Sequence, residues 1–398
     1  MSRILVLGGA GAQGSVTVTW LVRDPQISEV ICADICLERA EKLKDRLRSD
    51  KLRTVKVDVW KPDEILEVMR GVDIVINMVA TWIGKRSPVL NVMDAALKSG
   101  AHYIDPGVAY REEEEIMLKL SDKWRDAGLT AIFDLGKTPG ITNMCARYAA
   151  DRLDSVEEIH VKSCLDVISE KEFLLAWSPL AALSGLMEPA LIYDNGKFKE
   201  LPPFSGRDVY TFPDDPRGPC EGYLHDHEEV WTLPKFIPNV RYVEFKYYSH
   251  KIEIFKVLSQ IFGSKKPVNI KGVNVFPLDV LISLILPPSE LPEKIKAGLV
   301  EDIYSCAVVI VKGVKASKKV SYTLSCPMNL NESEKILPGS QPESILVGTP
   351  PAIVAKMLLN GEIKARGVMP PECLNPEPIL AKLVEKGIKI YIKMETLM

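Results

Sequence analysis

The amino-acid sequence predicts an α/β fold in which a doubly wound parallel sheet carries an inserted α+β domain with a largely antiparallel sheet. Three observations lead to this fold class. The chain opens with a short apolar run that passes directly into a glycine-rich loop. Strand-like and helix-like segments then alternate as far as Leu153. From Val156 onward, β-type runs separated by proline-rich turns dominate the sequence.

The first element is a strand that leads into a dinucleotide-binding loop. Residues 4–7 form an apolar run typical of a buried parallel strand, and the pattern G-x-G-x-x-G follows at once. A second apolar run, residues 30–33, ends at Asp34, twenty positions after the last of these glycines. Strand, glycines, helix and acid at this spacing indicate a Rossmann dinucleotide site. The loop residues expected to contact the cofactor are Gly9, Gly11, Ala12, Gln13 and Gly14.

Each residue of this motif has a physical task. Gly9 would permit the tight turn, Gly11 would let the backbone approach the pyrophosphate, and Gly14 would let the helix pack on the strand. The helix N-terminus presents N–H groups and a positive dipole to the phosphates. Asp34 would bind the ribose hydroxyls and repel a 2′-phosphate, which favours NAD(H), although nearby Arg39 leaves NADP(H) open.

The later strands place further polar residues at the carboxyl edge of the sheet, where ligands bind in such folds. Asp58 ends the third strand and would approach the adenine, or else be a solvated turn residue. Asn77 ends the fourth strand, and the loop from Asn77 to Trp82, with Ala80, would lie near the ribose and nicotinamide. The third to sixth strands are predicted at residues 55–59, 72–77, 102–105 and 129–135.

Helices are predicted between these strands and again near the C-terminus, by their amphipathic spacing and by proline or glycine at their ends. Their ranges are 15–22, 37–47, 62–69, 87–99, 111–127, 142–153, 349–359 and 378–386.

The second domain is predicted to be an insertion within the first. We expect residues 1–140 and about 345–398 to form the dinucleotide-binding domain, and residues 141–344 to form a substrate-binding and dimerisation domain. Two β-type runs of this domain, residues 306–311 and 320–324, lie on either side of Gly313 and are predicted to form a hairpin. The expected strands of this domain are residues 158–165, 190–193, 241–245, 306–311 and 320–324, and a further strand is possible at 388–392.

Composition narrows the class of protein. The chain has 398 residues, 46% of them hydrophobic and 26% charged, with a formal net charge of -3. These values are typical of a globular protein and argue against nucleic acid as a partner. No apolar run has the length of a membrane helix, so no membrane association is expected. Eight cysteines without a C-x-x-C pair favour reduced thiols in a cytoplasmic protein.

Several segments resemble a known family. They are GGAGAQG (8–14), NVMDAALKSGAHYIDPG (91–107), DLGKTPGITNMCARYAADRLD (134–154) and GEIKARGVMPPE (361–372). The chain resembles the saccharopine dehydrogenase family of oxidoreductases over nearly its whole length. WSPLAALSGLMEPALIYDNGK (177–197) is most similar to the lysine 6-dehydrogenase branch. The resemblance implies a Rossmann domain, a mixed α/β insert that binds substrate and forms a homodimer, and hydride chemistry at a carbon–nitrogen bond.

Oxidising an amine to an imine requires a base close to the nitrogen, with a pKa near the working pH. Asp105 and Tyr103, at the end of the fifth strand, are the preferred candidates, although Asp105 could equally form a turn or a helix cap. Lys137 precedes a predicted helix, and together with the N–H groups of residues 140–143 it could bind an anion. Lys137 could equally be a solvated loop lysine.

The segment around His225 offers substrate contacts. On a strand, His225, His227 and Glu229 would share one face, which makes a metal site conceivable, but we predict none. We instead expect His225 and His227 to contact substrate. Arg241 is a candidate clamp for a substrate carboxylate, or else a surface ion pair.

The sequence therefore predicts an NAD(P)-dependent oxidoreductase that transfers hydride at a C–N bond of an amino acid or its imine. The substrate is expected to be a small amino acid or amine. Lysine 6-dehydrogenase activity, which would release ammonia, is one alternative, and a polyamine-type reductive condensation is another. From a different class, the protein could be a non-catalytic NAD(H) sensor.

Overall fold

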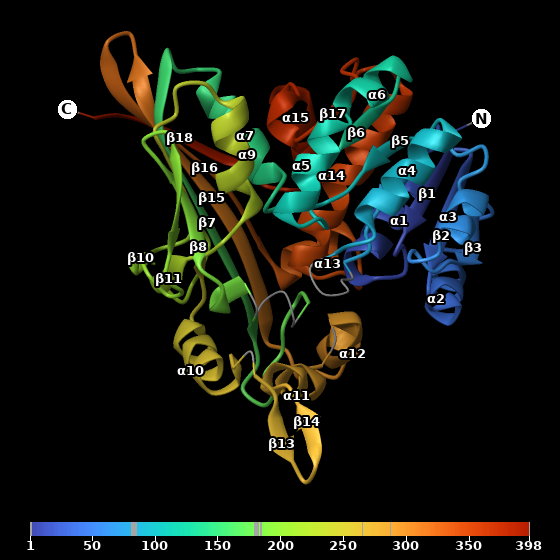
Figure 1. The fold of residues 1–398 in the computed structure, drawn as a ribbon, viewed down its shortest axis with the longest axis horizontal. Helices are drawn as coiled ribbons and strands as arrows, with labels where there is room; N and C mark the ends of the chain where they lie inside the picture. The colour runs from blue at the N-terminus through green and yellow to red at the C-terminus, as the bar shows by residue number, and fades with distance from the viewer. Residues whose placement is uncertain are drawn as a thin grey trace. The chain divides into compact units, whose positions relative to one another are not determined.

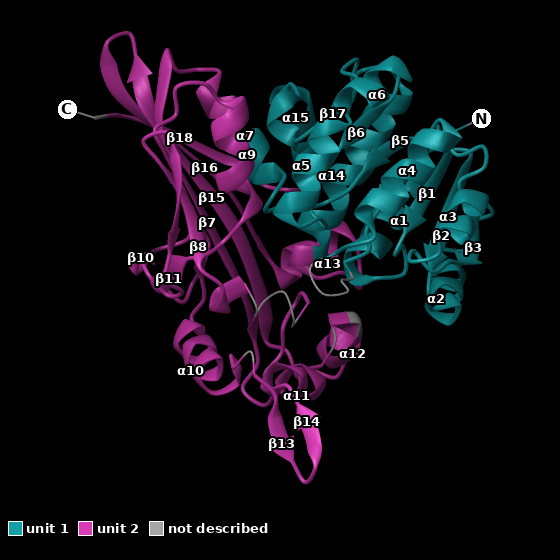
Figure 2. Cartoon of the chain, in the orientation of Figure 1, with its two compact units in different colours: residues 1–144, 344–386 teal, residues 145–343, 387–398 magenta. Residues whose placement is uncertain are grey.

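The computed structural model describes residues 2–80, 86–178, 183, 185–264, 266–286 and 288–397. The chain divides into two compact units, coloured separately in Figure 2. Unit 1 comprises residues 1–144 and 344–386, and unit 2 comprises residues 145–343 and 387–398. The second unit is thus largely an insertion, but the last twelve residues leave the first unit.

Unit 1 is built on a parallel sheet to which, among the described residues, seven strands contribute in the order β17-β6-β5-β4-β1-β2-β3 (Figure 1). The predicted doubly wound sheet is confirmed. Strand β17 was not predicted; its two apolar residues stand between Gly367 and Pro370, so the sequence shows no apolar run there. The strands are β1 (Arg3–Leu7), β2 (Glu29–Asp34), β3 (Leu52–Lys56), β4 (Ile74–Asn77), β5 (His102–Ile104), β6 (Thr130–Ile132) and β17 (Gly367–Met369).

The helices of unit 1 follow the predicted alternation, with two main differences, the first being that the helix predicted over residues 349–359 begins earlier, at Pro342. The helix predicted over residues 111–127 is divided at Leu120 into α5 and α6. The helices are α1 (Ala12–Arg23), α2 (Leu37–Leu47), α3 (Pro62–Val68), α4 (Val89–Ser99), α5 (Arg111–Lys119), α6 (Ser121–Asp126) and α15 (Pro376–Glu385), while α7 (Ile141–Ala150) and α14 (Pro342–Leu359) begin or end in unit 2.

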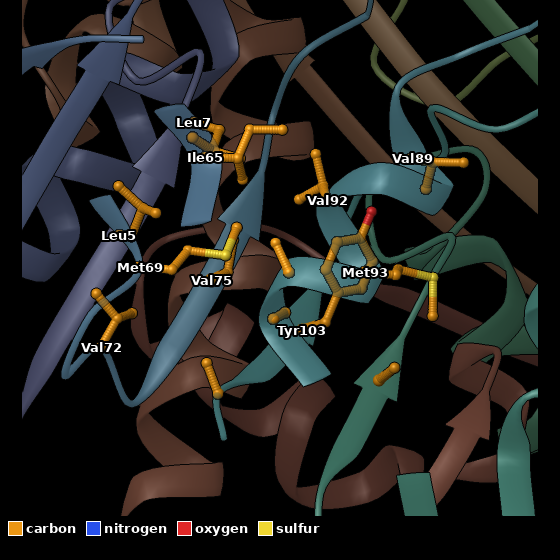
Figure 3. Packing of buried hydrophobic residues seen from close by; sticks show 14 of the residues in the cluster. Leu5, Leu7, Ile65, Met69, Val72, Val75, Val89, Val92, Met93 and Tyr103 are labelled. Carbon is orange, nitrogen blue, oxygen red and sulfur yellow. The ribbon is translucent and has the colours of Figure 1, made fainter. Parts of the chain in front are cut away.

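The core of unit 1 follows from strand alternation, because successive side chains point to opposite faces of a sheet. Leu5, Leu7 and Val75 belong to one fully buried apolar cluster, which Figure 3 shows together with Ile65 of α3. Helices α4 to α6 supply further members of this cluster. The opposite face receives α1, since Val18 of α1 lies beside Cys32 of β2 at Gly9. Helices therefore cover both faces of the sheet.

Unit 2 contains a mixed sheet whose main path, within the described residues, runs β10-β11-β12-β7-β15-β16-β18. Only the β12–β7 pair along this path is parallel, so the largely antiparallel prediction is confirmed. The β15–β16 pair is the predicted hairpin. The strands are β7 (Ser155–Ile168), β8 (Ala190–Asp194), β9 (Lys197–Leu201), β10 (Asp208–Tyr210), β11 (Cys220–Leu224), β12 (Tyr242–Tyr248), β15 (Asp302–Lys315), β16 (Lys318–Asn329) and β18 (Tyr391–Leu397).

The other α-helices and the small hairpin that the structure describes in unit 2 are short. They are α9 (Glu228–Phe236), α10 (Ile252–Phe262), the β13–β14 hairpin (Val268–Ile270 and Val273–Val275), α11 (Pro277–Leu284), α12 (Leu291–Lys296) and α13 (Leu330–Ile336). None of the described helices combines the length and the apolar character needed to cross a bilayer.

The C-terminal strand differs from the expected domain organisation. Residues 345–398 were expected to return whole to unit 1, but β18 pairs with β16 of unit 2 over seven registered positions. The predicted strand at 388–392 begins later, at Tyr391, and runs to Leu397. Apolar and charged residues alternate along it, as is usual at a sheet edge, which explains its place beside β16.

Candidate active site

The glycine loop of unit 1 has the geometry of a phosphate cradle. Gly8, and not Gly9 as expected, takes the left-handed conformation that makes the turn after β1, at φ +69°. Gly9 is required for close packing instead, because a Cβ there would lie 2.9 Å from the Cys32 sulfur. A Cβ on Gly14 would lie 2.2 Å from the Gly8 oxygen, so only glycine lets α1 start this close to the loop.

The start of α1 fits the pyrophosphate of a dinucleotide. Helix α1 begins at Ala12, with Gly11 as its N-cap and Gln13 in its first turn. The first N–H groups of a helix have no acceptor within the helix and attract anions. A Cβ on Gly11 would approach only the Gly8 oxygen, at 3.2 Å, so the chain stays open to a ligand there. The residues present therefore fit the cofactor that the motif implies.

Asp34 is the last residue of β2 and lies beside the glycine loop. Its side chain is 8% exposed, and its two carboxylate oxygens accept hydrogen bonds from the N–H groups of Ala10 (3.2 Å) and Cys36 (2.9 Å). The acid is thus held at the glycine loop, where a ribose would lie. Arg39 hydrogen-bonds the Cys36 thiol and lowers its pKa, which places a cationic side chain close to the end of β2.

The other predicted cofactor contacts lie along the same edge. Asp58 is in the turn after β3, which ends earlier than predicted, and its carboxylate accepts from the N–H of Trp60 at 3.0 Å. Asn77 is fully buried at the end of β4. Ala80 is exposed, and the predicted contacts that follow it, including Trp82, lie outside the described residues.

Asp105 is a buried carboxyl at the end of β5. One oxygen accepts from the N–H groups of Gly107 (2.8 Å) and Asp134 (3.4 Å). Burial raises the pKa of Asp105 to about 6, although these N–H groups, that of Val108 and the Tyr103 hydroxyl act in the opposite direction. A carboxyl that titrates near neutrality can accept and return a proton at working pH.

Tyr103 holds its proton and serves as a donor. Burial and the Asp105 charge raise the pKa of Tyr103 well above its usual value. Its hydroxyl accepts from Asn77 Nδ2 at 3.2 Å and donates to the Asp105 carboxyl. The ring packs edge-on against Trp124 within the cluster of Figure 3. The three side chains at the ends of β4 and β5 thus form one buried chain of hydrogen bonds.

Lys137 is buried, with 1% of its surface exposed, so it is not a solvated loop lysine. The prediction that the N–H groups of residues 140–143 could bind an anion is wrong. The Gly140 N–H donates to Asn143 Oδ1, and the N–H groups of Ile141 and Thr142 donate to the carbonyls of Gly136 and Lys137. These donors are already used within the chain, so they do not present themselves to a ligand.

A buried pair near this loop was missed. Asn143 Nδ2 donates to Glu372 Oε2 at 2.9 Å, and both residues are fully buried. Glu372 follows β17 and Asn143 lies in the first turn of α7, so the bond joins segments 229 residues apart. Both residues lie in the motifs quoted above, which was the available signal, but their proximity is a tertiary property.

In unit 2, the histidine segment does not form the strand on which His225, His227 and Glu229 would share one face. His227 is extended and caps α9, and Glu228 and Glu229 occupy the first helical turn. Acidic side chains are favoured there by the helix dipole, which outweighs the alternating pattern. His227 pairs with Glu229, which is fully buried, and lies 3.0 Å from Glu228. Its ring stacks on Phe245.

The two histidines carry different charges. Burial lowers the pKa of His227, but the nearby carboxylates of Glu229 and Glu228 outweigh it and raise the pKa to about 9. Burial lowers the pKa of His225 to about 3, so this ring is neutral. Since its Nδ1 faces the carbonyl of Asp226 at 2.7 Å, Nδ1 carries the proton and Nε2 is an acceptor. Among the described residues, nothing donates to that Nε2, which faces Gly185.

This group has the composition of a cation site. The possible ligand atoms of His227, Glu228 and Glu229 lie within 4.8 Å of one another. Burial and the Glu229 carboxylate raise the pKa of Glu228, whereas the His227 charge lowers it. Arg241 does not belong to this group, since its side chain is 65% exposed and pairs with Glu157 at 2.7 Å on the surface.

Comparisons with known proteins agree with this architecture. The model of the saccharopine dehydrogenase NADP binding domain matches residues 4–132, and that of the saccharopine dehydrogenase C-terminal domain matches residues 136–388. The chain is 25% identical over 402 residues to a carboxyaminopropylagmatine dehydrogenase of Synechocystis, covering 98% of this chain and 96% of that protein. It is 25% identical over 411 residues to a carboxynorspermidine synthase of Vibrio cholerae, covering 97% and 95%.

Two solved structures share the fold over the whole chain. Saccharopine dehydrogenase (L-Glu forming) from Saccharomyces cerevisiae has a TM-score of 0.70 at 17% identity, covering both chains completely. Homospermidine synthase from Legionella pneumophila, solved with NAD, has a TM-score of 0.71 at 16% identity and is covered over 91% of its length. The chain belongs to the saccharopine dehydrogenase family and is an NAD(P)-dependent oxidoreductase.

Proposed function

We propose that the protein transfers hydride at the C–N bond of a secondary amine that joins an amino-acid portion to a second, cationic amine, or at the corresponding imine. The observation that carries this proposal is Asp105, a fully buried carboxyl with a pKa of about 6 at the end of β5. Strand β5 is two strands from the glycine loop in the sheet order, about 10 Å at normal strand spacing. This distance is comparable to the length of the nicotinamide half of a dinucleotide cofactor.

In this mechanism, Asp105 removes the proton from the amine nitrogen on oxidation and returns it on reduction. Asn77 and Tyr103 position the Asp105 carboxyl through their hydrogen-bond chain. The bound nicotinamide ring supplies the hydride acceptor or donor. Gly14, Gly11 and Asp34 would hold the cofactor, and the carboxylate of Asp34 favours NAD(H).

The substrate class is inferred from the relatives named above, and unit 2, taken by itself, offers a group of side chains that suits a cation. His227 lies between the carboxyl groups of Glu228 and Glu229, and His225 Nε2 offers a lone pair. An ammonium or guanidinium group would satisfy both features. The relatives named above act, by their names, on polyamine-like compounds that bear a carboxyl group, which agrees with such a substrate.

Lysine 6-dehydrogenase activity is the second candidate, because the segment 177–197 resembles that branch and one of its residues, Gly185, packs against His225. Lysine likewise carries both an ammonium group and a carboxylate. The two candidates differ in their products. Oxidation of lysine releases ammonia, whereas the secondary amine yields a free amine and an aldehyde.

Nicotinamide absorbance, followed in both directions, distinguishes these reactions. We expect NAD(P)H consumption with an aldehyde-bearing amino acid only when a diamine or guanidino amine is added. Turnover of lysine with ammonia release would favour the second candidate, and no turnover with any amine would contradict both. Asp105→Asn is expected to lower kcat by about 10²- to 10⁴-fold while cofactor binding is retained. Asp122→Asn, on the surface of α6 in the same unit, is the matched control.

A further inference from the structure

The loop of residues 134–140 is built against Asp105. Asp105 Oδ1 accepts from the N–H of Asp134 at 3.4 Å, and the carbonyl oxygen of Asp105 accepts from the N–H of Leu135 at 2.8 Å. Asp134 takes the left-handed conformation, at φ +62°, which residues other than glycine adopt uncommonly. The start of the loop therefore holds Asp105 through both its side chain and its backbone.

The same loop packs against a second donor to Asp105. The N–H of Gly107 donates to Asp105 Oδ1 at 2.8 Å. A Cβ on Gly107 would lie 3.0 Å from Pro139 Cγ and 3.2 Å from Asp134 Oδ1, so the loop lies directly on Gly107. A displacement of the loop would therefore disturb the donors at Gly107 and Asp134 together.

The far end of the loop is closed tightly on itself. The N–H of Gly136 donates to the Pro139 carbonyl at 2.9 Å, and the N–H of Ile141 donates to the Gly136 carbonyl at 3.0 Å. A Cβ on Gly140 would lie only 2.1 Å from the Gly136 oxygen. Because Gly136 and Gly140 are in such close contact, a shift at Gly140 is transmitted to the start of the loop.

Asn143 holds Gly140, and Glu372 holds Asn143. Asn143 Oδ1 accepts from the N–H of Gly140 at 2.9 Å, while Asn143 Nδ2 donates to Glu372 Oε2 at 2.9 Å. An amide that uses its oxygen and its nitrogen in this way is held in one orientation, since a flip would lose both bonds. Both side chains are fully buried, so a lost bond is costly.

Glu372 reaches this loop because β17 lies beside β6 in the unit 1 sheet (Figure 1). Met369 of β17 is in register with Ile132 of β6, and the N–H of Phe133 donates to the Met369 carbonyl at 3.3 Å. Glu372 lies in the short helical turn Pro371–Cys373 that follows β17. The pairing of β17 with β6 thus brings the Glu372 carboxyl to the loop that follows β6.

We propose that Glu372 is a positioning residue for the reaction and that, through Asn143, it holds the loop of residues 134–140 in place on Asp105. This inference rests on the proposed function of Asp105 as the base, and it gives the C-terminal part of unit 1 a role in catalysis. Glu372 acts on the donors to Asp105 and not on the reacting atoms. Such donors stabilise the charged form of a carboxyl and fix its direction.

Removal of the Glu372 carboxyl should therefore weaken the donors to Asp105 and raise the pKa of that residue. In Glu372→Ala, we expect the acid limb of kcat/KM for amine oxidation to move upward from about pH 6, by roughly half to one pH unit. We also expect kcat to fall about 10-fold, because the base is less well placed. The KM for the cofactor should not change.

Two further variants test whether Glu372 acts through Asn143. Glu372→Gln keeps an acceptor oxygen for Asn143 Nδ2, so it should restore the wild-type midpoint. Asn143→Ala should move the midpoint as Glu372→Ala does. The double variant should move it no further, because residues that act in one chain of contacts are not additive.

Ser121→Ala is the matched control for a merely structural effect. The Ser121 hydroxyl accepts from the N–H of Val368 at 3.0 Å and so also ties β17 to unit 1, but it takes no part in the contacts between Glu372 and Asp105. This variant should lower the thermal stability and leave the midpoint of the acid limb in place.

Infrared titration of the Asp105 carboxyl separates this inference from the proposed function, since it needs no turnover. Each variant is measured against the same variant carrying Asp105→Asn. A pKa that rises in Glu372→Ala while the kinetic limb does not move would support the positioning role and contradict Asp105 as the base.

An Asp105 pKa that is unchanged in Glu372→Ala would overturn the positioning role. So would a shift that is as large in Ser121→Ala, or one that Glu372→Gln does not reverse. If Glu372→Ala does not fold, Asn143→Ala removes the same bond from its other end, and an unchanged Asp105 pKa in that variant would overturn the inference equally.

Discussion

Asp105 in unit 1 and His227 in unit 2 are both deeply buried ionisable groups, and the pKa of each is raised. The causes differ. Asp105 is raised to about 6 because burial penalises its charge, and the neighbouring N–H and O–H donors only partly oppose this. His227 is raised to about 9 because two carboxylates hold its charge against burial. Burial alone thus leaves a group able to exchange protons near neutrality, whereas burial with an opposite charge fixes its protonation.

Because their pKa values are raised for different reasons, we infer different roles for Asp105 and His227. Asp105 can lose and regain a proton under working conditions, as a base in amine oxidation must. His227 stays protonated across that range and provides a constant charge that keeps Glu229 in place. We infer that the first group moves protons and that the second fixes the electrostatics of a binding site.

Removing the ion pair between His227 and Glu229 in unit 2 is expected to have the largest effect on the free energy of unfolding. Glu229→Gln removes one partner of a buried charge and is expected to lower the free energy of unfolding at neutral pH by about 3–5 kcal/mol. Glu228→Gln is the control and should cost less, because its side chain is 31% exposed. Urea unfolding of both variants measures the difference. Equal losses would contradict the central place of the His227–Glu229 pair.

The His227–Glu229 pair also predicts the pH range over which the protein loses stability. The folded-state pKa of His227, about 9, lies above its ordinary value of 6.5. Its stabilising contribution is therefore complete below about pH 6.5 and lost as the pH rises through about 9. Glu229→Gln should flatten this alkaline loss of stability, and an unchanged slope would contradict the assignment.

The contrast also shows what the sequence could predict. The glycine loop, Asp34 and the alternation of strands and helices are local features, so the cofactor domain was correctly predicted. Asp105 could be chosen because strand ends meet at one sheet edge, but its pKa depends on tertiary burial. The Asn143–Glu372 pair and β17 depend on residues far apart in the chain. At His227, helix capping outweighed strand alternation, and Gly8 took the turn that was expected at Gly9.

A smaller effect is expected from neutralising Asp105. Its folded-state pKa of about 6 lies above the ordinary value of 3.8, so its contribution to stability is full below about pH 4 and is lost as the pH rises through about 6. Asp105→Asn keeps the acceptor oxygen and removes this loss, which amounts to about 3 kcal/mol. The variant should match the wild type near pH 4 and exceed it in thermal stability at pH 8. A variant less stable at both pH values would indicate that the carboxylate is needed structurally.

The smallest effect concerns the donor to Asp105. The Tyr103 hydroxyl lowers the pKa of Asp105, so Tyr103→Phe should raise that pKa further, by less than about one unit. Infrared titration of the carboxyl stretch, taken as the difference from the same variant carrying Asp105→Asn, would report the shift. A lowered pKa would show that Tyr103 acts on Asp105 in the opposite sense.

The pH dependence of kcat/KM for amine oxidation tests the central claim most directly, because it reports the essential base of the free enzyme. The account predicts that kcat/KM falls on the acid side with a midpoint close to the Asp105 pKa of about 6. It also predicts that this limb disappears together with most of the activity in Asp105→Asn. A profile with no ionisation near that pH, or the same limb in the Asn variant, would contradict Asp105 as the base.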